Sequence, residues 1–113
     1  MFDPNYKCLI GLIPFLYASI FNDYNFNSLS ILFFGILYHG NKNNLFLRYI
    51  DIVQCILNGS MVYYYNYASR IYGILALSSW LINNYYFNND YLHIFTQLVS
   101  WRGISLYENA LLN

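Results

Sequence analysis

The sequence predicts an all-α protein, a polytopic transmembrane helix bundle. Of its 113 residues 58% are hydrophobic and only 9% are charged, with five basic and five acidic side chains. A soluble domain carries about a quarter charged residues, so these charges are too few to cover a soluble globule of this size. The formal net charge is zero, which provides no basic footprint for nucleic acid. We therefore expect one transmembrane helical domain over residues 1–113, with membrane lipid as a partner and no nucleic acid.

Polar clusters divide the chain into five apolar segments. They run over about Tyr6–Phe21, Leu29–Tyr38, Leu45–Tyr65, Ala68–Phe87 and Tyr91–Leu112. A membrane-spanning helix needs about 20 residues, so the last three segments are long enough, whereas the first two need their polar flanks to reach the interfaces. We expect about five helices. The alternative is four, with the first segment in the interface or the second one re-entrant.

Local signals mark bends and ends within these segments. Pro14 predicts a kink in the first segment, which a membrane helix tolerates. Ser28 is the expected N-cap of the second segment, and Gly40 follows its expected C-terminal end. The pair Asn58-Gly59 resembles a turn, but a break there leaves two pieces too short to span a membrane. We expect the third segment to be continuous.

Two segments carry polar residues at helical spacing. The stripes are Arg48, Asp51, Cys55 and Asn58 in the third segment, and His93, Gln97 and Ser100 in the fifth. Polar side chains in membrane helices face other helices or a cavity. The stripes therefore indicate either interhelical hydrogen bonds or a functional site. The fourth segment instead carries small residues that allow close helix packing, namely Ser69, Gly73, Ala76 and Ser79.

Counting helices places three chemically active residues at one end of the bundle. His39 ends the second helix, Asp51 lies near the start of the third, and His93 lies near the start of the fifth. Because successive helices alternate in direction, these positions fall on the same side of the membrane. Two imidazoles and a carboxylate at one level are a donor set for a divalent transition metal such as zinc. The alternative is structural, with Asp51 paired to Arg48 one turn earlier.

These motifs resemble those of the alkaline ceramidase, hemolysin III and progestin/adipoQ receptor superfamily. The matching residues are Gly35-Ile-Leu-Tyr-His39, then Arg48-Tyr-Ile-Asp51-Ile, and finally His93-Ile-Phe-Thr-Gln97. The resemblance implies a helical bundle that binds zinc through histidines and hydrolyses lipid amides. It departs from the family at Gly35, where the family has serine, and at Gln97, where the family has a second histidine. The family also has more helices than this chain supplies.

Carried over residue by residue, the resemblance implies that His39 and His93 ligate zinc. Asp51 becomes a third ligand or the catalytic base that orients water. Gln97 stands as a weak replacement ligand, since a neutral amide oxygen suits zinc poorly. Our own addition is that Cys55, one turn from Asp51, could substitute as a thiolate.

Three functions follow from these observations. The first is a reduced, metal-binding relative of the lipid amide hydrolases, either active or binding lipid without turnover. The second is a non-catalytic membrane protein that acts through helix packing or lipid binding. The third is a channel or transporter subunit that uses the polar stripe of the third segment. Whatever the function, a second copy of the chain, in a homo-oligomer, is a possible partner, because two of the expected helices are short. Lys7, Lys42 and Arg48 lie at the same end as the two histidines, so this end and the N-terminus are expected to be cytoplasmic.

Overall fold

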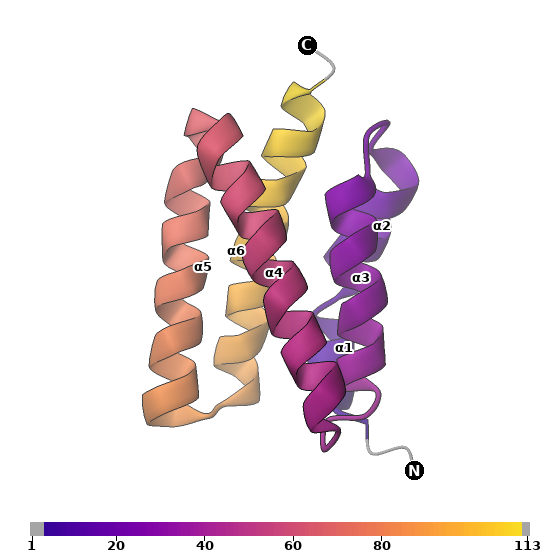
Figure 1. Cartoon of the computed structure of the whole chain (residues 1–113), viewed down its shortest axis with the longest axis vertical. Coiled ribbons are helices and arrows are strands. Elements are labelled where there is room, and N and C mark those ends of the chain that lie inside the picture. Colours follow the sequence, from indigo (N-terminus) through magenta and orange to yellow (C-terminus); the bar gives the residue numbers. More distant parts are fainter. Residues whose placement is uncertain (1–3, 112–113) are drawn as a thin grey trace.

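Helices and short turns make up residues 4–111, the part of the chain described by this computed structural model (Figure 1). The elements are α1 (Tyr6–Ile10), α2 (Ile13–Phe21), α3 (Phe26–His39), α4 (Leu45–Tyr65), η1 (Tyr67–Ser69), α5 (Arg70–Ile82), η2 (Asn83–Phe87) and α6 (Asp90–Ala110). The described residues form no β-strand, which confirms the all-α class. By length and composition, α4 is the one helix among these residues that is long and apolar enough to cross a membrane.

The first apolar segment is broken in the turn that precedes Pro14. The chain leaves α1 at Gly11 and re-enters helix at Ile13, so Pro14 is the second residue of α2. Proline at the start of a helix removes an N–H that would have no helical partner. The break therefore lies where the predicted kink falls, in the turn whose backbone the proline ring disrupts.

The ends of the next two helices differ in how well the sequence predicts them. Helix α3 begins at Phe26 after Asn25, so Ser28 is its third residue and the N-cap prediction is wrong. Gly40 follows the last residue of α3, as predicted. Helix α4 has the predicted bounds, and Asn58 lies within it without interrupting it.

Helices α5 and α6 pack along one another (Figure 1). The Ser69 hydroxyl donates to the backbone carbonyl of Gly103 at 2.8 Å. A Cβ added to Gly103 would lie 2.9 Å from the Cβ of Tyr72, so only glycine allows this approach. A Cβ at Gly73, the glycine expected to serve this purpose, would meet nothing within 4 Å. The close contact therefore depends on a glycine of α6 rather than on one of α5.

The interior of the bundle is unusually polar. Helix α4 illustrates this, because Gln54 and Asn58 face inward at 7% and 6% exposure while Leu57 faces outward at 65%. The amide of Asn27 donates to Asn58 at 2.7 Å, and the amide of Asn58 donates to Gln54 at 3.0 Å. These hydrogen bonds satisfy most of the buried amide groups, as burial requires.

A carboxylate lies at the far end of this interior. Glu108 of α6 is fully buried and accepts hydrogen bonds from the backbone N–H and the hydroxyl of Ser28 and from the amide of Asn22. The Asn25 side chain makes no capping bond at the start of α3. The carboxylate of Glu108 therefore caps α3 from another helix, where negative charge is favoured by the helix dipole.

Candidate metal site

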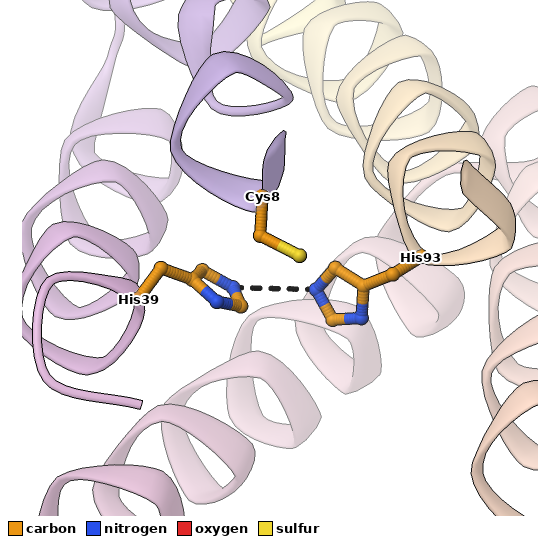
Figure 2. A group of neighbouring side chains, drawn as sticks. All are labelled: Cys8, His39 and His93. Carbon is orange, nitrogen blue, oxygen red and sulfur yellow. Dashed lines mark hydrogen bonds between the residues drawn. The ribbon is translucent and has the colours of Figure 1, made fainter. Parts of the chain in front are cut away.

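Three helices bring a thiol and two imidazoles together at one end of the bundle. Cys8 is on α1, His39 ends α3, and His93 lies in the first turns of α6. One donor atom of each residue lies within 4.8 Å of the other two. Figure 2 shows the sulfur of Cys8 pointing toward the space between the two rings. Cys8 is 2% exposed and His39 is 4% exposed, so the group is largely shielded from solvent.

The two imidazoles are close enough to share one ion. Their Nε2 atoms are 3.2 Å apart and form a hydrogen bond, drawn as a dashed line in Figure 2. One nitrogen must donate and the other must accept, so at least one ring is neutral and has a lone pair on its accepting nitrogen. Tetrahedral zinc with bonds of about 2.0 Å separates its nitrogen ligands by about 3.3 Å. Thiolate and imidazole are ligands that zinc prefers. The residues present therefore fit zinc.

Asp51 lies in the pocket that contains these donors, outside the cluster itself. The pocket has a volume of about 170 Å³ and includes Cys8, His39, Asp51, Asp90 and His93 in its lining. The amide of Gln54 donates to Asp51 Oδ1 at 3.0 Å, which extends the amide chain from Asn58 to this carboxylate. Arg48 does not take the predicted role beside Asp51, since its guanidinium donates to Asn84 at 3.2 Å.

The two residues expected to complete the ligand set have other roles. The Gln97 amide nitrogen donates to the backbone carbonyl of Cys8 at 2.9 Å, so Gln97 holds α1 against α6. Gly11 allows this arrangement, because a Cβ there would overlap the Gln97 side chain. Cys55 is exposed, whereas Cys8 is buried beside the histidines. The thiol of the site comes from Cys8 and not from Cys55.

Sequence reasoning missed Cys8, although a signal for it was present. Cys8 lies at the beginning of the first apolar segment and His39 at the end of the second. In two successive antiparallel helices these positions share one end. A thiol at that level, beside the two histidines, adds the soft ligand that a zinc site favours.

Gly35, where the resemblance led us to expect a serine, packs against Leu12. A Cβ added to Gly35 would lie 2.9 Å from both methyl groups of Leu12. Leu12 and Gly35 are both buried, and Leu12 belongs to the hydrophobic cluster of the bundle. A serine would fit here only if the Leu12 side chain moved.

Comparisons of the chain with protein-family models, with curated proteins and with solved structures find no match.

Proposed function

We propose that this protein is an integral membrane protein with several membrane-crossing helices that binds one zinc ion through Cys8, His39 and His93. The observation that carries the proposal is the convergence of a thiol and two imidazoles within 4.8 Å. Three protein ligands leave the fourth position of tetrahedral zinc open, which is typical of catalytic rather than structural zinc sites.

The distribution of polar and apolar side chains supports the membrane part of the proposal. Large apolar side chains are exposed along the outside of every long helix, among them Ile20 at 65%, Phe33 at 59% and Ile71 at 62%. Soluble monomers rarely expose apolar patches this extensive. The buried residues include more polar than apolar ones. Apolar side chains facing outward and polar ones facing other helices are expected of helices that lie in lipid.

Aromatic side chains and the length of the bundle agree with this environment. Exposed tyrosines gather where α4 ends, at Tyr64, Tyr65 and Tyr67, and a second group follows α5, at Tyr85 and Tyr86. Figure 1 places these two regions at opposite ends of the bundle. Tyrosine favours the membrane–water interface. The bundle is 43 Å long, which matches a bilayer with its head groups, about 40–45 Å.

Labelling with a membrane-impermeant thiol reagent tests whether α4 crosses the membrane. In a Cys55→Ser background, Asn43→Cys precedes α4 and Tyr67→Cys follows it. We expect Asn43→Cys to react only in inside-out vesicles and Tyr67→Cys only in right-side-out vesicles, because Lys7, Lys42 and Arg48 favour the cytoplasm for the first end. Reaction of both positions in the same vesicles would contradict the crossing, and the reverse pattern would contradict the orientation.

The zinc content of the detergent-purified protein tests the site, and the chain supplies a matched pair of cysteines. We expect about one zinc per chain in the wild type and in Cys55→Ser, but at least a tenfold loss of zinc in Cys8→Ser. Only Cys8 lies beside the histidines. Loss of zinc from Cys55→Ser as well would contradict the assignment of the thiol. A well-folded wild type without zinc, even after incubation with the metal, would reject the proposal.

Hydrolysis of a lipid amide is the more specific function that we propose for this site, and the position of Asp51 favours it. Zinc with an open coordination position supplies an activated water and polarises a carbonyl. Asp51 is in the same pocket, where Gln54 holds one of its oxygens at 3.0 Å. Its carboxylate would accept a proton from the attacking water.

A further inference from the structure

Asn5, the residue just before α1, makes hydrogen bonds to all three segments that carry the proposed zinc ligands. Its side-chain oxygen accepts from the backbone N–H of Cys8 at 3.2 Å. Its backbone N–H donates to the carbonyl of His39 at 2.7 Å. Its side-chain nitrogen donates to Asp90 Oδ1 at 3.1 Å. Asp90 is the first residue of α6 and precedes His93 by less than one helical turn.

Helix α1 needs such anchoring because it is very short. It contains five residues, and an isolated helix of this length does not form in water. The position of the Cys8 sulfur therefore depends on contacts between α1 and its neighbours. Asn5, Gln97 and the Cys8 thiol, which donates to Asp90 Oδ1 at 3.9 Å, make the hydrogen bonds to α6. Of these three residues, Asn5 also donates to α3, at the carbonyl of His39.

We propose that Asn5 is the positioning residue that assembles the metal site by fixing α1, the end of α3 and the start of α6 relative to one another. This inference rests on the proposed zinc site. Residues outside the ligand shell that orient metal ligands commonly affect affinity by a factor of 10 to 100. Asn5 would act in this way, through the backbone of two ligand residues and the helix start of the third.

The chemistry of asparagine explains why this residue type is required. Its side chain has an acceptor for the N–H of Cys8 and a donor for the carboxylate of Asp90 at the same time. Serine would keep the cap on α1 but is too short to reach α6 as well. Aspartate would also cap α1, but it would place a second carboxylate oxygen against Asp90, and like charges repel.

Cobalt binding to the full-length protein in detergent tests whether the bond from Asn5 to Asp90 matters for the metal site. Co²⁺ bonded to a thiolate has a charge-transfer band, which reports on Cys8. In a Cys55→Ser background we expect Asn5→Ser to bind Co²⁺ 10- to 100-fold more weakly and to lose most of the thiolate band. Asn5→Asp is expected to bind more weakly still. The control is Asn44→Ala, which removes an asparagine cap away from the site, the bond to the N–H of Leu47 at 3.1 Å in α4. It should bind Co²⁺ as the background protein does.

Alkylation of Cys8 in the metal-free proteins provides a readout that does not need the metal. Cys8 is 2% exposed, so it should react slowly in the background protein and in Asn44→Ala, and at least tenfold faster in Asn5→Ser. Unchanged alkylation in Asn5→Ser, or an equal increase in Asn44→Ala, would overturn the role of Asn5. Absence of Co²⁺ binding in a folded background protein would reject the zinc site itself, and the alkylation rates would still decide the role of Asn5.

Discussion

Replacement of Glu108 by alanine should lower the free energy of unfolding by about 3–5 kcal/mol. The substitution leaves the N–H and the hydroxyl of Ser28 without an acceptor and removes the shorter of the two bonds that the Asn22 amide donates, the other being to Ser105 at 3.4 Å. Each buried donor that loses its partner costs about 1–3 kcal/mol. The substitution also removes the cap of α3 and the negative charge that its N-terminus favours. Because Glu108 is fully buried, water cannot replace the lost bonds without a rearrangement.

Thermal or denaturant unfolding in detergent measures this effect, and two further variants define its origin. Glu108→Gln keeps one acceptor oxygen and should lose less stability than the alanine variant. Asp23→Asn removes an acidic charge from the exposed turn between α2 and α3, and it should change stability by less than about 0.5 kcal/mol. If Glu108→Ala unfolds at the wild-type midpoint, or if Asp23→Asn is equally destabilised, the capping role is wrong.

The helical segments were predictable because their signals are local. The run from Leu45 to Tyr65 is apolar and follows an asparagine that caps it, so its bounds follow from hydrophobicity and capping alone. The clusters of asparagine that separate the segments mark the turns for the same reason. His39, Asp51 and His93 line one pocket, which agrees with the common level deduced from alternating helix directions.

The remaining features depend on contacts between distant residues. Nothing near Glu108 in the sequence indicates that it caps α3, because its partners are 80 residues or more away. The glycine at position 11 is likewise explained by Gln97, which packs against it from another helix. The spacing of three and four residues in α4 suggested Cys55, whereas the buried face of that helix passes through Gln54 and Asn58. A stripe of polar residues identifies a helix face only approximately.

The polar interior links the two ends of the molecule in a consistent way. From Asn27 through Asn58 and Gln54 each amide donates toward Asp51. The chain ends on a carboxylate, which accepts a hydrogen bond best when it is ionised. Asp51 also lines the pocket that contains the proposed zinc ligands. The interhelical hydrogen bonds that we considered as a structural alternative therefore also orient the one residue expected to act as a base.

Asp51→Asn is expected to reduce lipid amide hydrolysis by a factor of 100 or more while zinc content stays near that of the wild type. General base catalysis contributes about 10²–10⁴-fold. Asparagine retains an oxygen for the amide of Gln54, so the amide chain and the fold should persist. Asp51 lies outside the cluster of Cys8, His39 and His93, and its replacement should therefore leave the ligands in place.

The assay follows release of fatty acid from an N-acylated long-chain amine in mixed micelles, with zinc measured on the same samples. The matched control is Asp90→Asn, which changes another carboxylate of the pocket and keeps an acceptor for Asn5. It should retain most of the activity, because asparagine keeps an oxygen for the bonds from Asn5 and Cys8 and the proposed base is Asp51. Equal activity of Asp51→Asn and wild type would exclude Asp51 as the base. A wild type that holds zinc and releases no fatty acid would contradict hydrolysis of this substrate class. The proposal of a zinc-binding membrane protein would stand, because Cys8 and the two histidines would still form the site.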